Sequence, residues 1–255
     1  THDMTPSETT ELFAHESIKR ILFKLAPPVM LAQTIQAFYS IVDCLFIGRA
    51  SETALTALSI VFPLQLLMLA FAVGAGVGVN TLIAAKLGEG DESAAKEYAG
   101  VATTLALVMW GLFAVATWLF MPQYAAAQTN TPLVIRDVLI YGRFVCVGSL
   151  GIFLESMWTK ILQAEGDMRT PTVAQIVGAL VNIALDPILI FGLLGAPQLG
   201  LLGAAIATVI GQVFSGILVI LYIRRFKTLP LKRKHFVPSP AVVLQTASLG
   251  TASCT

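Results

Sequence analysis

Two long runs without a charged residue constrain the fold of this chain more than any other feature. Residues 57–85 and 199–223 contain no Asp, Glu, Lys or Arg. Apolar runs of 18 or more residues are typical of helices that cross a lipid bilayer. Charged residues make up only 12% of the chain, whereas a soluble domain has about 25%. The sequence therefore predicts an all-α integral membrane protein.

The apolar runs predict a bundle of six transmembrane helices joined by short loops. The candidate spans lie near residues 27–48, 57–85, 98–120, 133–162, 172–193 and 200–223. The fourth is the weakest, because its charged residues leave only 144–154 uninterrupted, and we expect other helices to shield it. Those charged residues are Arg136, Asp137, Arg143, Glu155 and Lys160.

This division predicts three segments. Residues 1–26 form an N-terminal cytoplasmic or interfacial segment, 27–223 form the six-helix lobe, and 224–255 begin with a basic linker. Within the first segment, residues 18–25 place apolar and basic side chains on different faces. That pattern fits a helix lying on the membrane surface, or an ordinary extension of the first span.

The distribution of basic residues predicts the orientation. With six spans, one side of the membrane receives thirteen of the sixteen Lys and Arg residues, and the other side receives Arg49, Arg136 and Arg143. Cytoplasmic loops of membrane proteins carry the excess of Lys and Arg. Both termini are therefore predicted to be cytoplasmic. The basic cluster at 224–235 is then a linker near anionic lipid and not a nucleic-acid site.

Polar residues inside the spans recur at helical spacing. The first span carries Gln33, Gln36, Ser40 and Asp43, and the fifth carries Gln175, Asn182 and Asp186. Steps of three and four residues collect such side chains on one face of a helix. The inner half of span four adds Glu155, Ser156, Thr159 and Gln163, and span six adds Thr208, Gln212 and Ser215. The alternative is that these residues only form hydrogen bonds between helices.

Two carboxylates in the spans point to a specific function. A charge buried in a membrane costs at least about 2.5 kcal/mol, so such residues are rarely incidental. Asp43 and Asp186 are predicted at matching depth in the outer half, and Asn182 lies one turn before Asp186. Two carboxylates with an amide oxygen suit a proton or a small hard cation such as Na⁺. We expect an ion-coupling site; purely structural carboxylates are the alternative.

Several stretches resemble the multidrug and toxic compound extrusion (MATE) family, particularly its DinF-like branch. These are "QTIQAFYSIVDCLFIGR", "LQAEGDMRTP" and "NIALDPILIFGLLGAPQLGLLGAAIATVIGQ". The resemblance covers nearly the whole chain and implies one six-helix lobe of a twelve-helix transporter. The terminal "PAVVLQTASLGTASCT" resembles the start of a truncated seventh span. The expectation is a fragment, or a half-transporter that pairs with a C-terminal six-helix lobe.

The resemblance also implies roles for individual residues. It places the coupling site at Asp43, Asn182 and Asp186, which would also be the ligands of any Na⁺. Pro28 matches a proline at which the first span bends when the Asp is protonated, although a proline in a first helical turn is also ordinary. Further polar residues of the ion or substrate cavity would be Gln33, Gln36, Tyr141 and Thr159.

The expected function is export of amphipathic, often cationic compounds across a bacterial inner membrane in exchange for H⁺ or Na⁺, without another cofactor. Protonation or Na⁺ binding at Asp43 and Asp186 would displace the substrate. Three alternatives remain open. A flippase for lipid-linked oligosaccharides would need more intramembrane Lys or Arg, an intramembrane aspartyl enzyme would use the two acids catalytically, and a membrane fragment would transport nothing. An enzyme is not expected, since no HExxH or GxSxG motif is present.

Overall fold

The computed structural model describes residues 18–223, all of whose regular elements are helical. Residues 1–17 and the predicted basic linker with the start of a seventh span at 224–255 lie outside the described residues. The elements are α2 (Ile18–Ala50), α3 (Glu52–Gly88), α4 (Glu92–Gln128), α5 (Pro132–Gly148), α6 (Leu150–Ala164), α7 (Arg169–Phe191), the 3₁₀ turn η1 (Leu193–Gly195) and α8 (Leu201–Ile223). The predicted all-α fold is confirmed.

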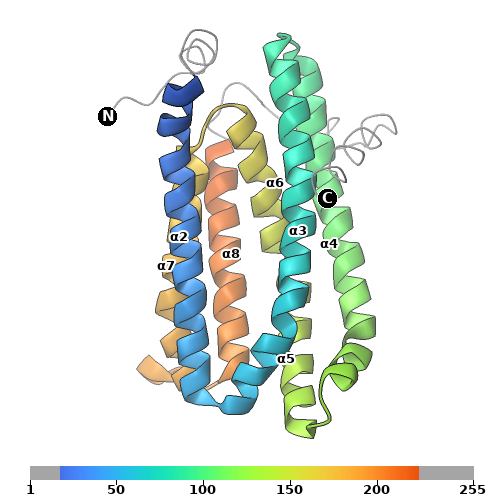
Figure 1. The fold of residues 1–255 in the computed structure, drawn as a ribbon, viewed down its shortest axis with the longest axis vertical. Helices are drawn as coiled ribbons and strands as arrows, with labels where there is room; N and C mark the ends of the chain where they lie inside the picture. Colours follow the sequence, from blue (N-terminus) through green and yellow to red (C-terminus); the bar gives the residue numbers. More distant parts are fainter. Residues whose placement is uncertain (1–17, 224–255) are drawn as a thin grey trace.

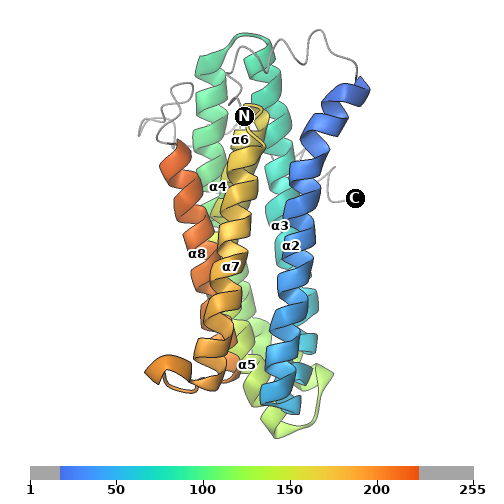
Figure 2. The ribbon, with the colours of Figure 1, turned by 90° about the vertical axis from the view of Figure 1, so that its left-hand side faces the viewer.

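The helices form an elongated bundle in which the chain runs up and down (Figures 1 and 2). α2, α4 and α7 run in one direction, and α3, the pair α5 and α6, and α8 return. We call the end with the loops 89–91 and 165–168 the inner end, and the opposite end the outer end, after the predicted orientation. That orientation remains a prediction, because the bundle alone does not distinguish the two sides of a membrane.

Five helical stretches in the described part are long and apolar enough to cross a membrane: α3, α4, α5 with α6, α7 and α8. α2 has 33 residues, which is about 50 Å of helix and more than the roughly 30 Å hydrocarbon core requires. It lies beside α7 in the bundle (Figure 2). α2 is continuous from Ile18, so the helix that contains the first predicted span begins nine residues before it. The position of residues 18–26 relative to the membrane stays a prediction.

Several helices exceed the predicted spans because their ends are polar and capped. α4 begins at Glu92, six residues before the predicted span, and the Asp91 carboxylate accepts a hydrogen bond from the backbone N–H of Ala94 at 3.0 Å. Such a cap satisfies a donor that the first turn leaves without a partner. Hydropathy marks only the part of a helix that suits lipid, and it misses these polar turns.

The fourth predicted span consists of two helices, α5 and α6, and not of one. The break is at Ser149, whose ψ is 0° and whose hydroxyl donates to the carbonyl oxygen of Cys146 at 2.6 Å. A serine that bonds a preceding carbonyl in this way competes with the regular helical pattern. Asp137, one of the charged residues that made this span weak, accepts a hydrogen bond from Thr53 of α3 at 3.0 Å.

α7 and α8 touch through glycines. A Cβ atom added to Gly178 would lie 2.8 Å from the carbonyl oxygen of Gly211, and one added to Gly211 would lie 2.8 Å from the carbonyl oxygen of Gly178. Nearer the outer end, a Cβ on Gly203 would lie 2.5 Å from the carbonyl oxygen of Leu189. Small residues permit this close approach in membrane bundles. The two helices are therefore packed backbone to backbone next to the candidate site.

Candidate functional site

Asp43 of α2 and Asp186 of α7 lie together in the outer half of the bundle. Asp43 stands seven residues before the end of α2, and Asp186 five residues before the end of α7. Their depths therefore differ by only about 3 Å. The two carboxylates are close enough to interact electrostatically, and their exposed fractions are 7% and 0%. The structure thus brings together the two acids that the sequence singled out.

Asn182 connects this pair to α8. Its side-chain Nδ2 lies 3.5 Å from Oδ1 of Asp186 and 3.4 Å from the hydroxyl oxygen of Thr208. The contact with Thr208 depends on the close approach of α7 and α8 at Gly178 and Gly211. The amide therefore directs its donor group to the two side chains and leaves its carbonyl oxygen free.

Three of the buried oxygens that have no hydrogen-bond partner within residues 18–223 belong to this group: Asp43 Oδ1, Asp186 Oδ2 and Asn182 Oδ1. A buried acceptor without a donor costs about 1–3 kcal/mol, and more when it is charged. Two carboxylates and an amide oxygen also form the type of donor set that a hard cation prefers. The chemistry of these residues therefore fits a proton or Na⁺.

Tyr141, predicted to belong to the ion or substrate cavity, lies within electrostatic range of the two carboxylates. It is buried in the apolar cluster of the outer half, within hydrogen-bonding reach of Gln65 on α3. The Tyr141 hydroxyl interacts electrostatically with the carboxylates of both Asp43 and Asp186. Tyr39 of α2 is near the same two acids and also near Glu155. Both tyrosine hydroxyls are thus within electrostatic range of the carboxylates, and Tyr39 alone of the two also borders the cavity.

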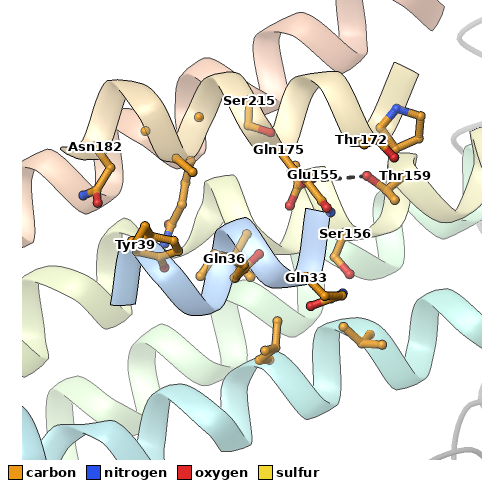
Figure 3. Close-up of a pocket in the computed structure, with 18 of the residues that line it drawn as sticks. Gln33, Gln36, Tyr39, Glu155, Ser156, Thr159, Thr172, Gln175, Asn182 and Ser215 are labelled. Carbon is orange, nitrogen blue, oxygen red and sulfur yellow. Dashed lines mark hydrogen bonds between the residues drawn. The ribbon is translucent and has the colours of Figure 1, made fainter. Parts of the chain in front are cut away.

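A polar cavity of about 200 Å³ extends from Asn182 toward the inner end of the bundle (Figure 3). Its walls come from α2, α3, α6, α7 and α8. The predicted residues Gln33, Gln36 and Thr159 line it together with Asn182, whereas Asp43 and Asp186 do not. Asn182 therefore connects the cavity to the carboxylate pair, because it lines the cavity and its amide donates a hydrogen bond to Asp186.

Glu155 is the carboxylate that lines this cavity in the described part of the chain, and sequence reasoning assigned it no role. It accepts a hydrogen bond from the Thr159 hydroxyl at 3.4 Å. The side chain of Gln175 on α7 is also within hydrogen-bonding reach, and Ser215 of α8 lies beside it. Figure 3 shows these side chains converging from three helices. The sequence already showed polar residues at helical spacing on spans four, five and six. Spacing alone did not show that these three polar faces point toward one another around Glu155.

Pro28 lies within α2, which is helical on both sides of it. The side chain of Pro28 is not among those the structure describes. The proposed bend at Pro28 therefore stays a prediction, and both alternatives given for this proline remain open.

Comparison with known proteins identifies the class. The MatE family model matches residues 28–188. The chain is 30% identical over 227 residues to "Probable multidrug resistance protein YoeA" of Bacillus subtilis (strain 168), covering 89% of this chain and 48% of that protein. It is 32% identical over 195 residues to a "FAD transporter" of Shewanella oneidensis, covering 75% of this chain and 42% of that protein. The chain thus spans about half the length of these relatives.

The fold has a counterpart among solved structures. A structure described as the outward-facing conformation of a multidrug resistance MATE family transporter superposes with a TM-score of 0.84 at 23% identity, covering 98% of this chain and 52% of that one. The bundle therefore has the same fold as about half of that structure. Because the family model matches residues 28–188, more than half of the chain, the chain belongs to the MatE family. The expected placement in the DinF-like branch stays a prediction.

Proposed function

We propose that this chain forms the ion-coupling lobe of a secondary active exporter, which moves amphipathic, often cationic compounds outward in exchange for H⁺ or Na⁺. The observation that supports this most directly is the position of Asn182. Its amide group contacts Asp186 in the carboxylate pair and also lines the polar cavity. Asn182 would then contact both a cation bound at the carboxylates and a substrate bound in the cavity.

The proposed mechanism is competition between two cations. With Asp43 and Asp186 charged, the field in the cavity favours a cationic substrate. A proton or Na⁺ that neutralises the pair removes this attraction and supplies the free acceptor oxygens with a partner. The substrate is then released, and the lobe returns with the ion bound. Alternating access requires the affinity for substrate to differ between these two states.

We further propose that the lobe functions with a second six-helix lobe. The relatives and solved structures that match this chain are about twice as long as the matched region. Gln33, on the rim of the polar cavity, is exposed on α2. A polar face of this kind is costly against lipid tails and is better covered by protein. The lipid bilayer and the transported compound are the remaining expected partners.

A second candidate is export of an anion that carries phosphate. The relative from Shewanella oneidensis is described as a FAD transporter, and Lys160 lines the cavity with its ammonium group hydrogen-bonded to Gln163 at 2.9 Å. Glu155 and the nearby carboxylate pair weigh against an anionic substrate, because like charges in a poorly solvated site repel. The same argument disfavours the flippase alternative, and Arg143 lies outside the cavity.

The test is transport by membrane vesicles that contain this chain, with and without the C-terminal half of the Bacillus subtilis relative. We expect a fluorescent organic cation to move when a proton or sodium gradient is imposed, and only when both lobes are present. FAD in the same vesicles should not move. Gradient-independent movement, or movement of FAD but not of the organic cation, would exclude the first candidate. Transport by the lone chain would exclude the two-lobe requirement.

A further inference from the structure

A second hollow lies on the outside of the bundle, between α4, α5 and α8. This groove has a volume of about 530 Å³ and is bordered by Trp118, Arg143 and apolar side chains: Leu139, Ile140, Phe144, Val147, Leu202 and Val209, with Gly148 at one end. Several of its apolar walls are exposed, including Ile140, Phe144 and Val147. It shares no lining residue with the polar cavity at Glu155. It is therefore a separate feature that the proposed transport function does not use.

Among the residues that the structure describes, Arg143 is the one charged residue that borders this groove. Its guanidinium lies 4.7 Å from the centre of the Trp118 ring, and one terminal nitrogen donates to the Trp118 carbonyl oxygen at 3.4 Å, at the surface of the bundle. Its Nε is buried without a hydrogen-bond partner, and none of the ion pairs formed within residues 18–223 includes this residue. A positive charge inside a span, held by an aromatic face but without a counter-ion, is costly unless an anion reaches it.

The depth of Arg143 identifies where that anion would come from. α5 and α6 together span Pro132–Ala164, about 50 Å of helix, so roughly 10 Å extends beyond the hydrocarbon core at each end. Arg143 lies about 16 Å along this length from Pro132, hence about 6 Å below the outer boundary of the hydrocarbon. A long arginine side chain bridges such a distance toward the headgroups. Trp118 at the same level fits the aromatic belt of that boundary.

We propose that this groove holds one anionic phospholipid, with its phosphate at Arg143 and an acyl chain along the apolar wall. Charge complementarity selects the headgroup, because the guanidinium lies at the phosphate level and forms no ion pair with a carboxylate of residues 18–223. The exposed side chains of Phe144 and Val147, with Val209 opposite, supply the surface for the chain. A zwitterionic lipid brings its own cation to the site and leaves the arginine charge uncompensated.

The experiment is native mass spectrometry of the purified, delipidated chain in detergent micelles, titrated with dioleoyl phosphatidylglycerol or dioleoyl phosphatidylcholine. We expect the first phosphatidylglycerol to bind about fivefold more tightly, the difference that one basic side chain near an anionic headgroup supplies. Arg143→Gln should bind the two lipids equally. Arg136→Gln is the matched control, since Arg136 is an exposed arginine on the same helix outside the groove, and it should keep the preference.

A second variant tests the groove itself. Val147→Trp places a bulky side chain in the groove, leaves the arginine in place, and should weaken binding of both lipids. Circular dichroism and gel filtration would verify that each variant is folded, and Arg143→Gln removes a charge from the span, so insertion should not suffer. Equal binding of the two lipids by the unaltered chain would overturn the proposal. So would a preference retained by Arg143→Gln, or complete displacement of the lipid by millimolar inorganic phosphate, which would mean that the groove contributes nothing.

Discussion

The amide nitrogen of Asn182 lies 3.5 Å from Oδ1 of Asp186, one helical turn further along α7. The same nitrogen lies 3.4 Å from the hydroxyl of Thr208. Asp186 and Thr208 thus hold the Asn182 amide group in one orientation, with its own carbonyl oxygen free. An Asp186 variant that keeps the size and hydrogen-bonding capacity of the side chain therefore tests the charge of the site alone.

Asp186→Asn should abolish ion-driven efflux while membrane abundance stays normal or rises. The amide keeps the size of the side chain and its bonding capacity, but it carries no charge to bind or release a cation. Asp43→Asn should act in the same way, and the double variant should be little worse than either single variant, because residues that work as one unit are not additive. The measurement is dye efflux from vesicles holding both lobes, normalised to abundance. Near-normal efflux by Asp186→Asn would show that the carboxylate is structural.

Glu155→Gln should weaken the affinity of the cavity for an organic cation at least about fivefold while leaving uptake of the coupling ion intact. The carboxylate is held by Thr159 and lies outside the Asp43 and Asp186 pair. A buried charge contributes more to cation binding than an exposed one, because water screens it less. Tryptophan fluorescence titration would give the dissociation constants. Glu92→Gln, at an exposed position at the start of α4, is the control and should change nothing.

Gly203→Ala should lower the thermal stability of the bundle by several degrees. Its Cβ would lie 2.5 Å from a backbone oxygen of Leu189, so one of the two helices must shift. Overpacking of this kind typically costs about 1–3 kcal/mol. Gly111→Ala on α4 is the matched control, because nothing lies within 4 Å of its added Cβ. Equal melting temperatures for the two variants in detergent would argue against the close contact of α7 with α8.

A cysteine at Gln123 should be labelled by an impermeant maleimide from outside intact cells, and one at Glu92 should not. These positions lie near opposite ends of α4, and the distribution of basic residues assigns Glu92 to the cytoplasmic side. The background should lack Cys44, Cys146 and Cys254, because Cys44 is exposed. Labelling with the opposite sidedness would reverse the predicted orientation.

Glu165, in the loop between α6 and α7, should make stability depend on pH. Burial, and secondarily the nearby charge of Asp167, raises the pKa of Glu165 from 4.5 to about 7. The folded chain therefore holds this proton more tightly than the unfolded chain, and stability falls as pH rises from about 4.5 to about 7. Glu165→Gln should flatten this part of the profile. Melting temperatures measured across that range check it, and an unchanged slope would contradict it.

The sequence predicted the bundle of long apolar helices because insertion into lipid depends on composition, which can be read directly from runs such as 57–85. Matching depth for Asp43 and Asp186 followed from counting residues along two spans that run in the same direction. The break at Ser149 could not be predicted, because it depends on the backbone angles of one residue in an apolar stretch. Asn182 and Thr208 meet only through the packing of α7 on α8, and periodicity places residues on a face without saying which faces meet.

The glycine contact between α7 and α8 limits how the site can change shape. With backbone pressed on backbone at Gly178 and Gly211, neither helix can rotate or slide past the other without a clash. Asn182, Asp186 and Thr208 are therefore fixed to one stiff unit. Asp43 is carried by α2, which packs mainly on α7 and much less on α8. A change in the distance between the helix that carries Asp43 and the helix that carries Asp186 must then come from movement of α2 relative to the rigid pair α7 and α8.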